Sequence, residues 1–296
     1  MKAEGWGGKL ALFVGLVLAW PASLWAGAWT LPQGKFWGKA TLFLQTTEEW
    51  YIASPEFSGG QLYGKGTRRP YRFEGEYQSR AVFLEGFYGL TERFDIGLQV
   101  PYFDQQFADA TRSEPPSDAG FSDIRLFAKA RFLQKPVIFT FKGGVKMPTG
   151  EFRNEDGLIP VGEGQWDYDL VAQVGRSFWP LPLYANAELG YRVRTKNDEI
   201  DRDPGDEWFL HAEVGYQLGQ RLLVMGKYEM LRSDPAIDFG FKNRSQIKRI
   251  TYLSPVLLID LGGSALELGL RYTLSGQNFP AGFQTTAGLS ASFGGG

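Results

Sequence analysis

Hydrophobic residues occupy every second position in a series of segments of about ten residues that begins after residue 28. In residues 183–194, one set of alternate positions carries Leu, Ala, Tyr and Val, whereas the positions between them carry Tyr, Asn, Glu, Gly and Arg. A β-strand turns successive side chains to opposite faces, so each segment has one apolar face and one charged face. The pattern predicts an all-β protein.

The alternation predicts twelve strands, an even number that suits a closed, antiparallel, up-and-down barrel. The predicted strands are residues 36–49, 77–90, 94–107, 121–133, 136–148, 166–178, 182–195, 207–218, 220–232, 246–259, 264–275 and 281–293. Short connections such as 91–93 alternate with long polar ones such as 50–76, 108–120 and 149–165. Outer-membrane barrels have short periplasmic turns and longer outer loops, which places both ends of the chain in the periplasm.

Heavy charge of both signs on the second face distinguishes between two classes of β-protein. A membrane barrel turns its apolar face to lipid, whereas a soluble sandwich or lipocalin-like barrel buries that face. Aromatic residues recur on the apolar face near strand ends, as they do in membrane girdles; they are Phe94, Tyr102, Trp166, Tyr168, Tyr191, Trp208, Tyr216, Tyr272 and Phe293. We therefore predict a transmembrane β-barrel of the bacterial outer membrane, surrounded by lipid and lipopolysaccharide.

The amino terminus has the layout of a secretion signal. Lys2 and Lys9 lie before an apolar run at residues 10–20, which is short for a bilayer span, and Ala-Gly-Ala at 26–28 fits a cleavage site. We expect residues 1–28 to be removed as a signal peptide and residues 29–296 to form the barrel. The alternative is a retained membrane anchor.

Charge and composition exclude several functions. Removing Lys2, Lys9 and Glu4 with the leader reduces the 31 basic and 33 acidic residues to 29 and 32, which leaves no basic surplus for nucleic acid. The chain has no cysteine, so it has no disulfide, no thiol nucleophile and no lipid-anchor cysteine. Aromatic residues at 15% and 38 glycines suit a membrane barrel. We predict no cofactor.

The predicted lumen face carries the candidate functional residues. A basic wall on two neighbouring strands would lie opposite carboxylates from later strands, and rings of charge set the selectivity of narrow pores. The basic wall is Arg125, Lys129, Lys142 and Lys146, and the other candidates are Glu188, His211, Glu213, Glu229, Glu267 and Arg271. The same charges can instead fill a tight barrel as a polar core, because buried charges need partners. Composition leaves both arrangements open, and also whether residues 50–76 fold inward as a plug.

Catalytic and metal-dependent functions have little support. A lipid hydrolase needs a nucleophile beside a His base, but the single histidine, His211, is predicted to face the lumen and has no Ser two residues away. One His without Cys offers no metal-ligand cluster, and the acidic loop 198–206 lacks the full calcium-loop pattern. We expect no enzymatic activity and no metal; a hydrolase centred on His211 is the third alternative.

The last predicted strand ends in an aromatic residue. Residues 286–293 are amphipathic and end at Phe293, although three glycines follow it. The segment resembles the carboxy-terminal signal that closes many outer-membrane barrels. We expect the barrel assembly machinery to recognise the chain through this strand.

Two segments resemble a known family. Residues 120–129, GFSDIRLFAK, are similar to the Gly-x-Gly-Asp strand opening of the outer-membrane proteins grouped under the meta-pathway of phenol degradation, with Ser122 in place of the second glycine. Residues 144–150, GVKMPTG, are similar to the Lys-x-Pro-Thr-Gly strand exit of that group. The resemblance implies an outer-membrane β-barrel linked to the uptake of hydrophobic or aromatic compounds, and it supplies no binding residues.

These observations together predict a channel or transporter for the passive passage of small-molecule solutes, with hydrophobic or aromatic compounds as candidates. The main alternative is a plugged structural or adhesion barrel that acts through its outer loops.

Overall fold

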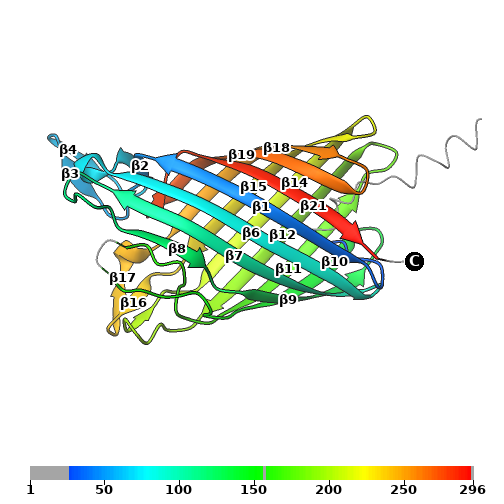
Figure 1. The fold of residues 1–296 in the computed structure, drawn as a ribbon, viewed down its shortest axis with the longest axis horizontal. Coiled ribbons are helices and arrows are strands. Elements are labelled where there is room, and N and C mark those ends of the chain that lie inside the picture. Colours follow the sequence, from blue (N-terminus) through cyan, green and yellow to red (C-terminus); the bar gives the residue numbers. More distant parts are fainter. Residues whose placement is uncertain (1–26, 156–157, 295–296) are drawn as a thin grey trace, which may run out of the picture.

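Twelve strands run up and down around one axis in the computed structural model, which describes residues 27–155 and 158–294 (Figure 1). Strand β1 pairs with both β6 and β21, which closes the ring, so the predicted antiparallel barrel is confirmed. The barrel strands are β1 (Phe36–Thr47), β6 (Glu76–Thr91), β7 (Phe94–Ala108), β9 (Arg125–Leu133), β10 (Ile138–Lys146), β11 (Asp167–Ser177), β12 (Leu183–Arg194), β14 (Glu207–Leu218), β15 (Leu222–Ser233), β18 (Arg249–Asp260), β19 (Ser264–Gln277) and β21 (Phe283–Phe293).

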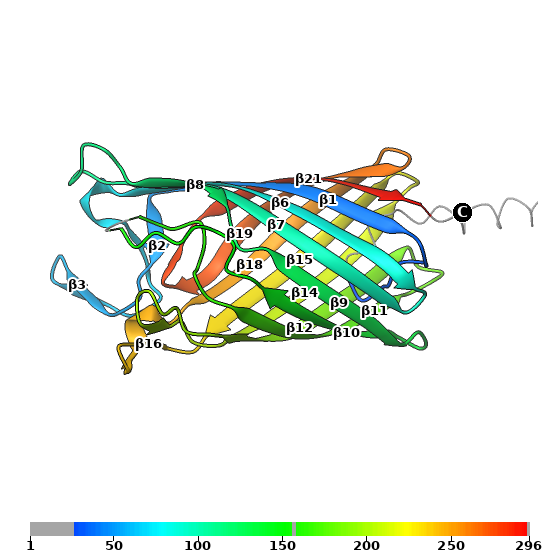
Figure 2. The ribbon, with the colours of Figure 1, turned by 60° about the horizontal axis from the view of Figure 1, so that its bottom comes forward.

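The two ends of the barrel differ. One end has short turns and holds both ends of the described chain, and the other carries the long connections (Figures 1 and 2). By the rule for outer-membrane barrels, the end with long connections is extracellular. The elements outside the barrel wall are β2 (Glu49–Tyr51), β3 (Glu56–Ser58), β4 (Gln61–Tyr63), β5 (Arg68–Pro70), β13 (Arg202–Asp203), β16 (Ala236–Asp238), β17 (Phe241–Asn243), β20 (Phe279–Pro280) and two 3-10 turns, η2 (Arg72–Glu74) and η3 (Arg244–Gln246).

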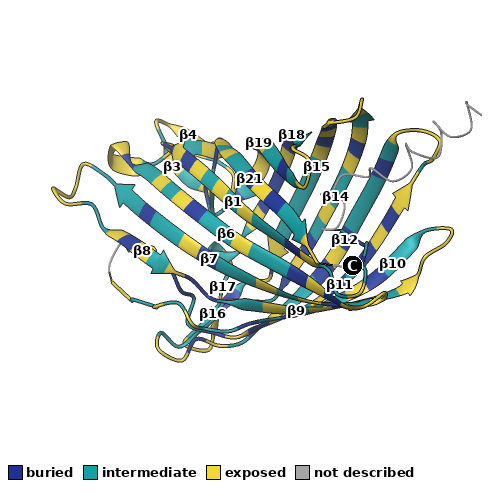
Figure 3. Cartoon of the chain, turned by 45° about the vertical axis from the view of Figure 1, so that its right-hand side comes forward, coloured by how far each residue is buried: buried dark blue, intermediate teal, exposed yellow. Residues whose placement is uncertain are grey.

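Burial alternates along the strands, as their side-chain period of two requires. In β11, Leu170 is 63% exposed on the outer face whereas its neighbour Val171 is 1% exposed on the inner face. Figure 3 shows the same banding of buried and exposed residues on strand after strand. The outer face is therefore an apolar surface that suits lipid, and the inner face holds the polar side chains.

Glycine allows large rings to lie flat against the inner wall. Phe209 of β14 pairs in register with Gly190 of β12. A methyl group at position 190 would lie 2.1 Å from the Phe209 ring, so a larger residue there would displace the ring. Phe87 lies against Gly97 in the same way. These positions let a narrow barrel contain aromatic side chains.

The predicted strand 121–133 is wrong at its start. The ladder breaks at residues 122–124, between β8 (Ser117–Phe121) and β9, and β7 pairs with each of them in turn. The carboxylate of Asp123 accepts hydrogen bonds from the backbone N–H groups of Gly150 and Glu163, both at 3.1 Å. This segment therefore binds the loop between β10 and β11 instead of continuing the ladder.

The predicted strand 246–259 also begins later than expected, at Arg249. The residues before it form η3, which the side chain of Asn243 caps by accepting a hydrogen bond from Ser245 N. Residues 1–26, which hold most of the predicted signal peptide, lie outside the described residues. Residues 27–35 lead into β1.

Candidate functional site

The ten predicted lumen residues all lie on the inner side of the barrel wall, but the expected opposition of a basic wall and an acidic wall is not observed. Each cation instead pairs with a nearby carboxylate. Arg125 Nη1 lies 3.1 Å from Asp169, and Lys142 Nζ lies 3.4 Å from Glu188. Local pairing follows from burial, because a charge removed from water needs a partner within a few ångströms.

The network is densest in the extracellular half of the barrel. Lys146 Nζ lies 3.0 Å from Asp123 and 3.2 Å from Asp167, and all three side chains are at most 2% exposed. Lys146 also pairs with Glu163 of the β10–β11 loop. The motif residues Asp123 and Lys146 therefore share one role, which is to hold this loop against the inner wall.

The loop is also held through the second motif. The hydroxyl oxygen of Thr149 accepts a hydrogen bond of 3.0 Å from Ile124 N. Gly150 approaches the backbone of Ser122 so closely that a methyl group at position 150 would lie 2.9 Å from it. The two motifs thus form a single junction between two segments that are distant in sequence.

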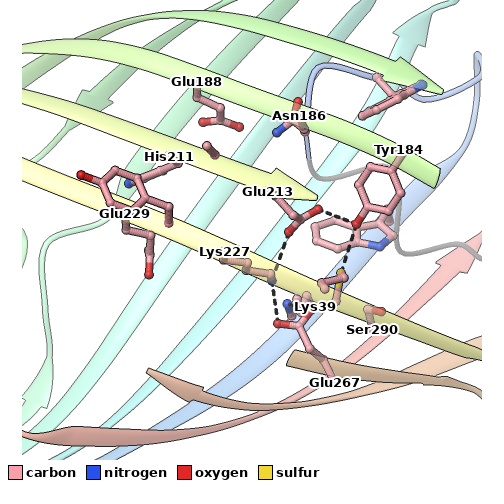
Figure 4. Close-up of a pocket in the computed structure, with 16 residues that line it drawn as sticks. Lys39, Tyr184, Asn186, Glu188, His211, Glu213, Lys227, Glu229, Glu267 and Ser290 are labelled. Atoms are coloured by element: carbon pink, nitrogen blue, oxygen red, sulfur yellow. Dashed lines mark hydrogen bonds and ion pairs between the residues drawn. The ribbon is translucent and has the colours of Figure 1, made fainter. Parts of the chain in front are cut away.

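A second ionic chain runs across the periplasmic half of the lumen (Figure 4). The hydroxyl of Tyr184 donates to Glu213 at 2.6 Å, and Lys227 lies 3.4 Å from Glu213 and 3.0 Å from Glu267. Lys39 of β1 completes the chain, with its Nζ 2.8 Å from Glu267. Residues from strands far apart in sequence are thereby joined across the inner face.

Arg271 and His211 line the middle of the lumen. The guanidinium of Arg271 donates to Glu229 at 2.7 Å and lies 3.6 Å from the centre of the Tyr252 ring. His211 lies beside the ring of Phe209, with a centroid separation of 5.5 Å. No group of metal ligands occurs among the described residues. His211 lines two of the lumen cavities, and this inner position is the one that the alternation predicts for it.

One part of the inner wall is aromatic, and the sequence analysis did not identify it. Phe43 of β1, Phe83 of β6 and Phe103 of β7 point inward and contact one another edge to face, with centroid separations of 5.2 and 5.6 Å. In the strand order, β6 and β7 lie across the ring from β14 and β15, which carry His211 and Glu229. The sequence carries a signal for this patch, because Phe43 and Phe103 have the same parity as Lys39 and Gln99 on their strands and therefore share the polar face.

The segment before β1 enters the periplasmic end of the lumen, which was also not predicted. Trp29 lines a lumen cavity, and Leu31 is 1% exposed. Lys129 Nζ donates to the carbonyl oxygen of Trp29 at 2.6 Å, and Leu31 N donates to Asp95 at 3.1 Å. Residues 50–76, the plug considered above, lie at the extracellular end (Figure 1), where Tyr51 packs against Ile250 and Tyr252 of the inner wall.

Ala28, the last residue of the predicted signal peptide, is also placed inside the barrel. Its N–H donates to Asn186 at 3.0 Å, and its carbonyl oxygen accepts from Thr140 at 2.5 Å. The segment is therefore bound at several points along the inner wall.

Four cavities follow the lumen from one end to the other. The cavity at the periplasmic end, beside Trp29, has a volume of about 180 Å³, and the central cavity has about 530 Å³. A cavity of about 280 Å³ lies under the β10–β11 loop, and one of about 270 Å³ lies at the extracellular end. The central cavity shares a lining residue with each of the others. It shares His211 with the periplasmic cavity, Phe83 with the cavity under the β10–β11 loop and Tyr77 with the extracellular cavity.

The extracellular cavity is lined mainly by rings. Trp50 and Tyr71 stack with their planes 14° apart, and Tyr71 meets Phe107 edge to face. Burial raises the pKa of the Tyr71 phenol above its ordinary value of 10.0, which already keeps the hydroxyl neutral at physiological pH. This entrance can therefore contact a flat apolar molecule without an opposing charge.

The apolar exterior, the charged inner face and the closed ring define a β-barrel of the bacterial outer membrane. A family model described as "Putative MetA-pathway of phenol degradation" matches residues 71–287. Since this match spans most of the chain, the protein belongs to that family. The family resemblance predicted from the two motifs is confirmed.

One solved structure shows the same fold, and others are similar at lower scores. An outer membrane channel from Pseudomonas putida F1 is similar with a TM-score of 0.74 at 16% identity, covering 90% of this chain and 98% of that one. The translocator domain of the autotransporter NalP from Neisseria meningitidis has a TM-score of 0.47 at 10% identity, with 96% of both chains covered. The monoaromatic hydrocarbon channel CymD has a TM-score of 0.45 at 10% identity, with 89% of both covered. No curated protein matches the sequence.

Proposed function

We propose that this protein is a channel for the passive passage of small molecules across the outer membrane, with aromatic compounds among its solutes. The observation that carries the proposal is the succession of cavities that share lining residues from the periplasmic end to the extracellular end. Each cavity offers space for a small molecule, and the shared residues mark the route between them.

Two features support aromatic solutes. The entrance beside Trp50 and Tyr71 and the inner rings of Phe43, Phe83 and Phe103 offer flat apolar contacts along one side of the route. Ring contacts of this kind favour other rings in offset or edge-to-face geometry. The family description, which refers to phenol degradation, agrees with such solutes. The opposite wall is ionic and keeps the route hydrated.

The direct test is single-channel recording of the refolded protein in a planar bilayer at two salt concentrations. We expect discrete current steps that grow with salt. A folded and inserted protein that gives no steps would contradict an aqueous route. It would favour the second candidate, a plugged barrel. The N-terminal segment that is bound to Lys129 would be the plug.

Ion selectivity tests the proposed role of the lumen charges. Lys142→Gln removes a cation from the wall and leaves Glu188, which Gln173 still contacts at 2.7 Å. We expect the reversal potential under a salt gradient to shift toward cation selectivity. Lys135→Gln, in an exposed turn at the barrel end, is the matched control. Equal selectivity in the two variants would exclude Lys142 as a determinant.

We also propose that the last strand is the contact for the barrel assembly machinery, in a membrane of lipid and lipopolysaccharide. Phe293 ends β21, is 61% exposed and stacks on Phe36 at the closing seam, with centroids 6.3 Å apart. Phe293→Ala should lower the amount of heat-modifiable barrel in the outer membrane. Phe132→Ala, an exposed ring on another strand, controls for loss of apolar surface.

The proposal includes no catalytic step. The third alternative, a hydrolase, requires His211, so lipid hydrolysis that is present in the wild type and absent from His211→Ala would revive it.

A further inference from the structure

Glu85 is a carboxylate in the central cavity that has no hydrogen bond or ion pair among the described residues. It lies on the inner face of β6, in register with Lys39 of β1 on one side and with Gln99 of β7 on the other. Both neighbours line the same cavity. An acceptor without a partner in this position is available to a solute that enters the cavity.

The lysines around Glu85 are already paired. Lys39 lies 2.8 Å from Glu267, and Lys142 lies 3.4 Å from Glu188. Lys129 lies 3.4 Å from Asp95 and is 1% exposed. Glu85 therefore differs from the other carboxylates of this region in lacking a close cation.

The three inner rings of Phe43, Phe83 and Phe103, called here the aromatic ladder, lie next to Glu85. Phe83 is two residues before Glu85 on the same face of β6, and Phe43 and Phe103 flank Phe83 from the neighbouring strands. All four residues line the cavity of about 530 Å³. A flat ring that packs against Phe83 can thus place a polar substituent at Glu85.

We propose that Glu85 and the ladder of Phe43, Phe83 and Phe103 form a binding subsite for a neutral aromatic molecule with a hydroxyl group on its ring. The ring packs against Phe83, and the hydroxyl donates a hydrogen bond to the Glu85 carboxylate. The ligand thus supplies a hydrogen bond to a cavity-lining oxygen that has no partner among the described residues. The subsite rests on the proposed channel function, because it lies on the route that the solute would follow.

The charges select against anionic aromatic ligands. An aromatic carboxylate would place its anion beside Glu85, where Lys39 and Lys142 are already paired with other carboxylates and do not offset the repulsion. A neutral donor meets no such penalty.

Binding can be measured independently of transport. We would titrate the refolded full-length barrel in detergent with 4-fluorophenol, fluorobenzene and 4-fluorobenzoate and follow the ¹⁹F signals. We expect 4-fluorophenol to bind about tenfold more tightly than fluorobenzene, because only the phenol donates a hydrogen bond to the otherwise unpartnered Glu85. We expect 4-fluorobenzoate to bind most weakly.

Variants separate the two parts of the subsite. Glu85→Gln should weaken 4-fluorophenol binding about tenfold and leave fluorobenzene unchanged, whereas Phe83→Leu should weaken both. Glu74→Gln, in the extracellular η2 turn, and Phe141→Leu, on the outer face, are the matched controls. Heat-modifiable gel mobility shows whether each variant is folded, and Glu85→Leu serves as a second variant at that position.

The outcomes distinguish the subsite from the channel. Equal binding of 4-fluorophenol and fluorobenzene, or no effect of either Glu85 substitution, would overturn the subsite even if ionic current is observed. Selective phenol binding that depends on Glu85, in a protein without current, would support the subsite and contradict the channel.

Discussion

Lys129 Nζ donates a hydrogen bond of 2.6 Å to the carbonyl oxygen of Trp29, a residue 100 positions earlier in the chain. The same ammonium lies 3.4 Å from Asp95, whose carboxylate accepts a hydrogen bond from Leu31 N. One buried ion pair thus serves two purposes, since it neutralises a charge inside the barrel and holds the N-terminal segment in the periplasmic end of the lumen.

Releasing this segment should widen the pore. In Lys129→Met combined with Asp95→Asn, the segment loses the ammonium donor and a charged acceptor, while neither charge is left alone. We expect larger single-channel conductance than in the wild type. Lys129→Met alone should also lower the free energy of unfolding of the barrel by about 3–5 kcal/mol, because it leaves the buried carboxylate of Asp95 without its ion-pair partner. Unchanged conductance in a folded double variant would show that the segment does not limit the pore.

The site at which the signal peptide is cleaved decides which contacts the N-terminal segment keeps, and the mass of the secreted protein reveals that site. Cleavage after Ala28, as the Ala-Gly-Ala motif predicts, retains the contacts of Trp29 and Leu31 and removes those of Ala28 to Asn186 and Thr140. Mass spectrometry of the outer-membrane form should therefore precede the conductance measurements.

Asp123→Asn should loosen the β10–β11 loop. The substitution removes the charge that pairs with Lys146 and replaces one of the two oxygens that accept from Gly150 and Glu163. We expect faster cleavage by a glutamate-specific protease at Glu155, which lies in the loop. Asp109→Asn, in another extracellular loop, should leave this cleavage rate unchanged. Equal cleavage rates in both variants would show that Asp123 does not hold the β10–β11 loop in place.

The extracellular pair of β13 and β16 should respond to pH. Partial burial opposes ionisation of Asp238, but hydrogen bonds from Arg202 and Asn243 together hold its pKa below the usual range. A carboxyl group with a lowered pKa in the folded state stabilises that state at neutral pH. The contribution is lost as the pH falls below the ordinary value near 3.8 and through the lowered one.

Amide hydrogen exchange of β13 and β16, corrected for the intrinsic pH dependence of exchange, measures this effect. Protection should be full at pH 7 and should decline below about pH 4. Asp238→Asn should remove the pH dependence, and Asp234→Asn should preserve it. The same decline in both variants would assign the effect to other groups.

The lipid-facing surface can be tested by placing a charge on it. Leu170 is 63% exposed on the outer face of β11, away from both strand ends. Leu170→Arg should lower the free energy of unfolding in lipid by about 2–4 kcal/mol, whereas Leu181→Arg, in a turn, should cost about 1 kcal/mol or less. Denaturant titration in vesicles measures both values. Equal costs would mean that Leu170 does not face the hydrocarbon.

Particular residues show where sequence reasoning succeeded and where it did not. The alternation through Glu188 and His211 placed both correctly on the inner face, because the side of a strand on which a residue lies depends only on its parity. The pairing of Lys142 with Glu188 was not predictable in the same way, because it depends on the order and register of β10, β11 and β12 in the closed ring.

The sequence by itself determined the number of barrel strands and most of their bounds, their two faces, the closed antiparallel class and the membrane that suits it. These properties follow from a period of two residues and from local turn chemistry. Only the tertiary structure decided what fills the lumen: the N-terminal segment beside Lys129, the loop bound by Asp123 and the unpartnered Glu85 beneath Phe83. Each depends on contacts between segments that closure of the ring brings together, and no local pattern encodes that proximity.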